Sequence, residues 1–162
     1  MILTTTIRSF LARAALGLLL PFSCLEAQTV TNYGTGCFGM SLTTSELPDV
    51  TTAPFNFLVT GIPAGSILNI LFWSYAKPAF PFDLAFLGAP GCWLLLDQPV
   101  IYAFNLFPVG TTETFTSGAP NPLIYNTAAW VDIEMFVQAV SLIPLINAGG
   151  FATSNGVALV GG

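Results

Sequence analysis

The sequence predicts an all-β protein: one antiparallel β-sandwich, jelly-roll-like, built from about eight short strands and closed by one disulfide. Three observations predict it. Short segments rich in Val, Ile, Phe, Leu and Thr are separated by Gly- and Pro-containing turns. One long segment alternates apolar and polar residues with a period of two. Two cysteines remain once a predicted export segment at the N-terminus is set aside.

The first 27 residues have the pattern of a secretory signal peptide. Arg8 and Arg13 precede the apolar run 14–22, and small residues lead to a cleavage site after Ala27. The run is shorter than the roughly 20 apolar residues that a membrane-spanning helix needs. We therefore expect a signal peptide over 1–27 and one secreted domain over 28–162. In an alternative interpretation Cys24 is the acylated first residue of a lipoprotein.

Composition restricts the function of this domain. Hydrophobic residues make up 54% of the 162-residue chain and charged residues 7%, whereas ordinary domains have about 25% charged residues. After residue 27 there are seven acidic side chains, no His, and Lys77 as the single basic side chain. Such a domain would repel the phosphate backbone, so we expect no nucleic-acid partner. We expect it outside the cell, on the cell surface or in the periplasm, with no transmembrane helix after cleavage.

Turn residues divide the mature chain into candidate strands. The main dividing segments are 61–65, 77–81, 88–91 and 117–122, which are rich in Gly and Pro. The candidate strands are Phe55 to Thr60, Ser66 to Tyr75, Leu84 to Leu87, Trp93 to Leu96, Val100 to Leu106, Thr111 to Thr116, Trp130 to Leu142 and Val157 to Val160. In addition, Asn155-Gly156 has the composition of a tight hairpin turn.

The segment from Trp130 to Leu142 has the clearest alternation. Its length is also compatible with a helix, but its β-branched residues and its period of two favour a strand. One face is expected in the core and consists of Val131, Ile133, Met135, Val137 and Ala139. The opposite face is expected in water and carries Asp132, Glu134 and Gln138, interrupted by Phe136.

Cys37 and Cys92 are the two cysteines left in the mature chain, and export would expose them to an oxidising compartment. We predict that they form a disulfide. Two unrelated buried thiols are the alternative interpretation.

Several short motifs occur in an order that resembles a known family. They are Tyr33-Gly34-Thr35-Gly36-Cys37, Gly61-Ile62-Pro63-Ala64-Gly65, Phe86-Leu87-Gly88, Pro90-Gly91-Cys92, Phe136-Val137-Gln138-Ala139 and Thr153-Ser154-Asn155-Gly156. In this order the chain resembles an uncharacterised family of small secreted bacterial β domains, which occur alone or at the C-terminus of large exoproteins. The resemblance implies a secreted β fold and no established activity or catalytic residues.

No motif in the chain predicts catalysis. The segment from Gly34 to Gly39 matches G-x-G-x-x-G, but a dinucleotide site needs a strand before it and a helix after it, so we interpret it as a Gly-rich loop beside Cys37. The absence of His excludes Ser-His-Asp and Cys-His arrangements. A carboxylate-based hydrolase would need Asp132 or Glu134 near Asp83 or Asp97. We expect no enzyme activity, no cofactor and no metal.

Aromatic side chains are the remaining candidates for binding. Trp73, Tyr75, Trp93 and Trp130 could stack on sugars if at least two of the rings were exposed and coplanar; otherwise they belong to the core. Low charge and high apolar content favour a structural module that associates with itself or with a surface. We therefore expect a secreted or cell-surface structural, self-associating module. The alternatives are a carbohydrate-binding module and, after it, a hydrolase, and the possible partners are the protein itself, the cell surface or a polysaccharide.

Overall fold

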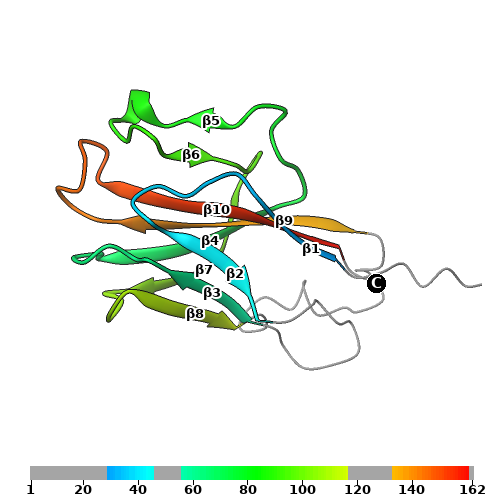
Figure 1. Cartoon of the computed structure of the whole chain (residues 1–162), viewed down its shortest axis with the longest axis horizontal. Coiled ribbons are helices and arrows are strands. Elements are labelled where there is room, and N and C mark those ends of the chain that lie inside the picture. Colours follow the sequence, from blue (N-terminus) through cyan, green and yellow to red (C-terminus); the bar gives the residue numbers. More distant parts are fainter. Residues whose placement is uncertain (1–28, 46–55, 117–132, 161–162) are drawn as a thin grey trace, which may run out of the picture.

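The computed structural model describes residues 29–45, 56–116 and 133–160, which form an all-β structure (Figure 1). These residues contain ten strands and one turn of 3-10 helix. In chain order the elements are β1 (Thr29–Tyr33), β2 (Ser41–Thr44), β3 (Asn56–Thr60), β4 (Leu68–Ser74), β5 (Phe82–Asp83), η1 (Ala85–Leu87), β6 (Trp93–Leu94), β7 (Val100–Leu106), β8 (Thr112–Thr116), β9 (Glu134–Leu142) and β10 (Phe151–Val160).

Two antiparallel sheets pack face to face as a sandwich. The larger sheet has the strand order β1-β10-β9-β4-β7, and the smaller sheet has the order β2-β3-β8. Side chains from both inner faces form one hydrophobic core, which confirms the predicted fold class. The core includes Leu42, Phe57, Val59 and Phe115 from the smaller sheet, and Leu71, Met135, Val137, Ala139, Val157 and Leu159 from the larger one.

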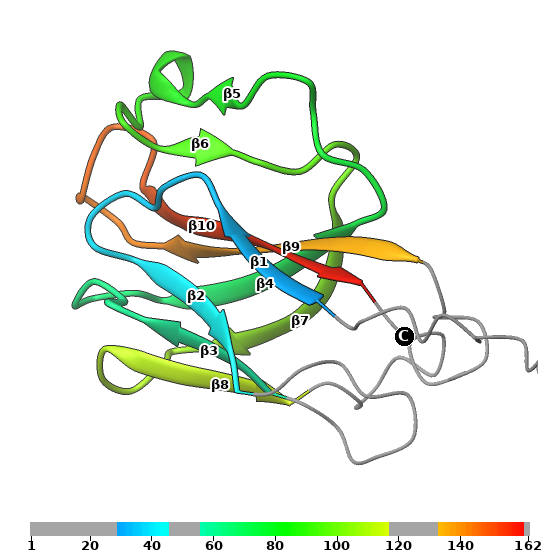
Figure 2. The same cartoon turned by 45° about the vertical axis from the view of Figure 1, so that its right-hand side comes forward.

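A third, smaller layer covers part of the outer face of the larger sheet. It consists of the β5–β6 hairpin and the residues that follow it, and Figure 2 shows it above β9 and β10. Leu96 packs against Phe136 and Ala158 on that outer face. The side chain of Gln138 accepts a hydrogen bond from the Leu95 amide and donates one to the Trp93 carbonyl. The larger sheet is therefore buried on both faces at Phe136 and Gln138 of β9.

This third layer corrects the prediction of a solvated face on β9. Glu134 is exposed as expected, but Phe136 and Gln138 are buried under residues 93–96, which we call the β6 segment. On the core face, Met135, Val137 and Ala139 are buried as predicted, whereas Ile133 is 37% exposed and precedes the strand. Residues 130–132, which the prediction also included, lie outside the described residues.

The burial of this strand leads to a stability prediction. Met135→Ala should lower the free energy of unfolding by about 2 to 5 kcal/mol, because it empties a fully packed site. Ile133→Ala should lower it by less than about 1 kcal/mol, because that side chain is already partly in water. Urea titrations of both variants measure the difference. An equal loss for the two substitutions would contradict the register of β9.

The N-terminal part of the described chain contains strands that the sequence did not predict. β1 pairs with β10 and β2 pairs with β3, so the segment from Gly34 to Gly39 connects two strands and no helix follows it. The expected Gly-rich loop beside Cys37 is thus confirmed. The predicted strand from Leu84 to Leu87 is wrong, because Ala85–Leu87 form a single 3-10 turn.

The predicted turn at Asn155-Gly156 is also wrong, since both residues lie inside β10, where the pairing with β9 shifts register between Thr153 and Gly156. The Asn155 side chain accepts a hydrogen bond from the Leu42 amide and donates one to the Leu42 carbonyl, at 2.7 and 3.0 Å. Asn155 therefore links β10 to β2 across the sandwich. A Cβ at position 156 would lie 2.3 Å from the Tyr33 ring, so this position needs glycine.

The predicted disulfide is confirmed. Cys37 and Cys92 are joined, with 5.0 Å between their Cα atoms, and both are buried. The bond connects the β1–β2 loop to the loop between β5 and β6. No helix in the described part of the chain is long and apolar enough to cross a lipid bilayer.

Candidate functional site

Trp73 and Tyr75, at the end of β4, do not form a flat stacking surface. Trp73 is only 9% exposed, Tyr75 is 62% exposed, and their rings meet edge to face at 87° with centroids 4.6 Å apart. A sugar-binding platform needs exposed rings in one plane. The Trp73–Tyr75 pair therefore does not fulfil the condition that the carbohydrate hypothesis sets.

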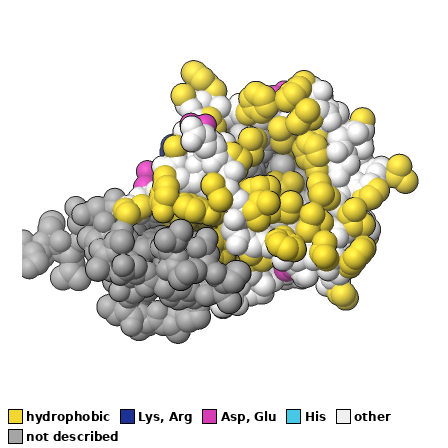
Figure 3. Space-filling model, turned by 180° about the vertical axis from the view of Figure 1, so that it is seen from behind, with side chains coloured by type: hydrophobic (Ala, Val, Ile, Leu, Met, Phe, Trp, Pro, Cys, Tyr) yellow, Lys and Arg dark blue, Asp and Glu magenta, His cyan; other side chains and the backbone are white. Residues whose placement is uncertain are grey.

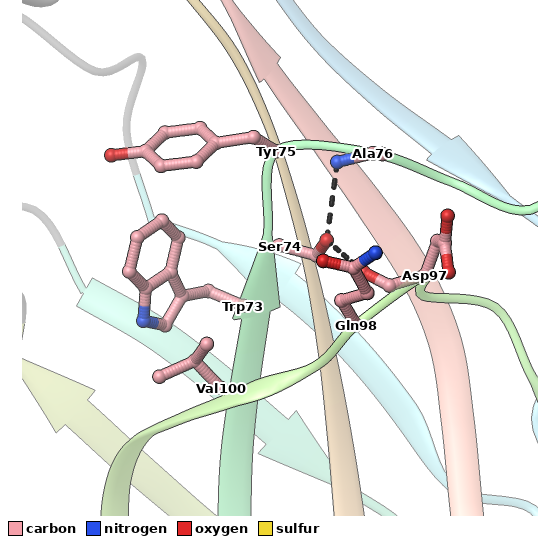
Figure 4. A pocket seen from close by; sticks show the side chains of 7 residues that line it. All are labelled: Trp73, Ser74, Tyr75, Ala76, Asp97, Gln98 and Val100. Atoms are coloured by element: carbon pink, nitrogen blue, oxygen red, sulfur yellow. Dashed lines mark hydrogen bonds between the residues drawn. The ribbon is translucent and has the colours of Figure 1, made fainter.

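A pocket of about 280 Å³ lies beside these rings (Figure 4). It is lined by Trp73, Ser74, Tyr75, Ala76, Asp97, Gln98 and Val100. The Ser74 hydroxyl donates a hydrogen bond to the Asp97 carbonyl and accepts one from the Ala76 amide. This hydroxyl therefore stabilises the local backbone and is not available to bind a ligand. The Trp73 indole Nε1 is buried without a hydrogen-bond partner, but Figure 4 shows it on the side of the ring away from Asp97 and Gln98.

The other two predicted aromatic residues do not join this pocket. Trp93 is half-buried on β6, where it pairs with Asp83 of β5. Trp130 lies outside the described residues.

The acidic side chains that could support hydrolysis lie on different elements. Asp83 accepts a hydrogen bond from the Ala85 amide, Asp97 lines the pocket beside Trp73, and Glu134 is exposed at the start of β9. Asp132 lies outside the described residues. Within the described ranges, no group of three or more His, Cys, Asp or Glu side chains could hold a metal ion.

Glu113, which is half-buried, belongs to a chain of hydrogen-bonded polar side chains that the sequence did not predict. Its carboxylate accepts a hydrogen bond from the Asn69 side-chain Nδ2, and the Asn69 Oδ1 accepts one from the Ser141 hydroxyl. Asn69 and Ser141 are almost completely buried between the sheets. This hydrogen-bonded chain ends at a groove of about 280 Å³ between β7 and β8, which Phe104, Asn105 and Glu113 help to line. Each polar group in it has a partner, which indicates a structural role.

Lys77 and Tyr33 lie at the edge of the third layer. The Lys77 Nζ lies 5.6 Å from the centre of the Tyr33 ring and 5.5 Å from that of Phe136, which is within the range of a cation–π contact. The Tyr33 hydroxyl donates to the Leu95 carbonyl at 3.2 Å. Burial, and secondarily the Glu134 carboxylate, raises the pKa of Tyr33 above its usual range. The phenol therefore stays neutral and serves as a hydrogen-bond donor.

β7 is the most unusual edge of the two main sheets. Within the described chain it pairs only with β4, so it is an edge strand of the larger sheet. Four of its seven side chains are exposed and apolar: Val100, Ile101, Phe104 and Leu106. No charged residue occurs from Gln98 to Thr112. The sequence predicted this strand but not its exposure, because its apolar residues do not alternate with polar ones.

The apolar side chains of β7 continue across the outer face of the larger sheet. Phe104 pairs with Ile70 and Leu106 pairs with Leu68, and both β4 partners are half-buried. Figure 3, which shows the molecule from behind, has hydrophobic side chains gathered over much of the visible face and few charged ones among them.

The other three edges of the main sheets differ from β7. β1, β2 and β8 have the sequences TVTNY, SLTT and TETFT, which are rich in threonine, and β8 carries Glu113. In comparisons of the chain with protein-family models, curated proteins and solved structures, none matches it.

Proposed function

We propose that the protein is a secreted structural module, without catalytic activity, that self-associates by pairing β7 with β7 of a second copy. The observation that carries this proposal is the uncharged, apolar edge of β7. An exposed edge strand pairs readily with another chain, and soluble proteins usually protect such edges with charges, bulges or very short strands. β7 has seven residues, and its pairing with β4 shifts register beside Tyr102, so the regular stretch that it offers to a second strand is 103–106.

A second copy of the chain fits this edge better than a charged partner does. Two antiparallel β7 strands can pair about a two-fold axis, so that each copy offers the same surface. Because the strand has no charged residue, the pairing places no like charges opposite one another. The outward side chains Phe104 and Leu106 would be brought together with their equivalents on one extended sheet face. The Cys37–Cys92 disulfide supports the secreted location.

Substitution of Phe104 tests the proposal. Phe104→Lys adds a cation to the outer face of the edge strand in each copy, and we expect it to raise the dissociation constant of the oligomer by at least about tenfold. Sedimentation equilibrium over a range of protein concentrations measures this. The side chain is largely exposed, so thermal unfolding should change little.

Thr31→Lys is the matched control, because it places the same cation on an exposed position of β1, the opposite edge of the same sheet. It should leave the oligomer unchanged. A wild-type protein that stays monomeric at every concentration, or an oligomer that Phe104→Lys does not weaken, would overturn the proposal.

A further inference from the structure

One end of the sandwich consists of five connecting loops, at residues 34–40, 61–67, 84–92, 107–111 and 143–150. Figures 1 and 2 show them together at the end drawn on the left. Hydrogen bonds join the Phe107 amide to the Ile67 carbonyl and the Gly149 amide to the Gly88 carbonyl. The disulfide joins the first loop to the third. A Cβ at Gly61 would lie 2.0 Å from the Gly39 carbonyl oxygen, so the second loop also touches the first. The five loops therefore form one continuous surface, which we call the loop end.

The loop end is apolar and has no charged residue. None of the five segments contains Asp, Glu, Lys or Arg. Its exposed large hydrophobic side chains are Phe38, Ile67, Phe86, Leu87, Phe107, Val109 and Leu145. Leu145 is 98% exposed and Val109 is 94% exposed, so these side chains project from the surface rather than cover a neighbouring residue. Isolated exposed apolar residues are ordinary, but seven of them on one uncharged surface indicate a binding role.

The backbone holds three of these side chains outward in an unfavourable conformation. Phe38, Phe107 and Leu145 have positive φ angles of 54°, 52° and 73°. Gly or Asn would adopt this region at a lower cost than a bulky apolar residue. Asn147 fixes the loop of Leu145, because its side chain accepts a hydrogen bond from the Gly150 amide and donates one to the Phe151 carbonyl. Stability alone does not explain large apolar residues at such positions, whereas insertion into an apolar medium does.

We propose that the loop end inserts into the surface of an uncharged lipid layer. The side chains project separately from five loops, and a lipid layer adapts to them without the matching shape that a protein partner would need. The absence of Lys and Arg from these loops removes the attraction to anionic headgroups on which many peripheral proteins depend. Phe, Leu, Ile and Val are also the residues that enter hydrocarbon most favourably.

The fold allows the loop end to point toward a lipid layer, because the first described residues of β1 and β3 lie at the opposite end of the two sheets. Thr29 pairs with Val160 at the opposite end of the larger sheet, and Asn56 pairs with Thr116 at the opposite end of the smaller one. Hydrogen bonds between the loops, such as that from the Ile62 amide to the Thr111 carbonyl, satisfy backbone groups that would otherwise lose water on insertion.

Vesicle flotation of the mature, disulfide-bonded protein tests the proposal. We expect the wild type to float with phosphatidylcholine vesicles, equally well at low and high salt, because the interaction is not ionic. The double variant Val109→Ser/Leu145→Ser should bind about 100-fold more weakly, on the order of tenfold for each aliphatic side chain that no longer leaves water. Both side chains are almost fully exposed, so the variant should keep the stability of the wild type.

Phe80→Ser is the matched control, because Phe80 is 85% exposed but lies in the connection between β4 and β5, outside the five loops. It should float like the wild type. The Phe104→Lys variant should also still float, which separates lipid insertion from self-association through β7.

Three results would overturn the proposal: wild-type protein that does not float, flotation that survives in the double variant, or flotation that requires anionic lipid and disappears in high salt. A second measurement uses Leu145→Trp. Its tryptophan emission should shift to shorter wavelength when phosphatidylcholine vesicles are added, and an unchanged spectrum would also contradict insertion.

Discussion

Replacing Gln138 with leucine should lower the free energy of unfolding by about 4 kcal/mol, because several buried backbone groups would lose their partners at once. Gln138 is completely buried on β9. Its Oε1 accepts a hydrogen bond from the Leu95 amide at 3.0 Å. Its Nε2 donates to the carbonyls of Trp93 and Ser154, at 2.8 and 2.9 Å. Leucine fills a similar volume but offers none of these bonds.

Urea unfolding measures this loss, and hydrogen exchange shows its location. The Leu95 amide should exchange slowly in the wild type and much faster in Gln138→Leu, because the side-chain oxygen that it bonds has been removed. Glu134→Gln is the control on the same strand, and it should change stability by less than about 0.5 kcal/mol because Glu134 is exposed. A Gln138→Leu variant within about 1 kcal/mol of the wild type would mean that the β6 segment does not dock on β9.

The local sequence pattern was sufficient to predict the strands of the sandwich core. β3, β4, β7 and β8 lie within the predicted segments, and β9 begins inside its predicted range. In each case apolar and β-branched residues in a short run are enough to specify an extended, half-buried segment. The disulfide could be predicted because the expected removal of residues 1–27 would leave the chain with two cysteines.

What the sequence could not predict depends on contacts between distant segments. Phe136 and Gln138 are buried because residues 93–96 fold back over β9, and nothing within 130–142 contains that information. β1 and β2 are polar, and they become strands through their pairing with β10 and β3. Asn155-Gly156 resembles a turn because the same residues that favour turns also suit a bulge beside the Tyr33 ring.

The two surfaces proposed for binding, β7 and the loop end, could not be predicted from the sequence for the same reason. The residues of β7 are apolar in the sequence, but only the sheet order shows that β7 is an edge. The loops that form the loop end are far apart in the chain. Their common lack of charge has meaning only once the hydrogen bonds and the disulfide bring them together. Not all of the aromatic residues that the sequence suggested for binding are available for it. Trp73, for example, is buried in the hydrophobic core, as aromatic residues of β-sandwiches often are.

Removing the disulfide should lower the free energy of unfolding by about as much as the substitution Gln138→Leu. The bond between Cys37 and Cys92 closes a long loop, with a sequence separation of 55, and the double variant Cys37→Ala/Cys92→Ala should lose about 4 kcal/mol by the loop-entropy relation. Urea unfolding of the oxidised wild type, the reduced wild type and the double variant measures this loss. The last two should have similar midpoints, well below that of the oxidised protein.

The double variant is its own control, because a reducing agent should not change its unfolding midpoint. Thiol titration adds an independent test: the denatured, unreduced mature protein should contain no free thiol, and two free thiols per chain would contradict the disulfide. The structure also predicts where stability is lost first. Cys92 lies at the start of the β6 segment and Cys37 in the β1–β2 loop, so reduction should release the third layer before the sandwich core. Hydrogen exchange should then rise at Leu95 before it rises at Val137, and a simultaneous rise at both would mean that the layers unfold as one unit.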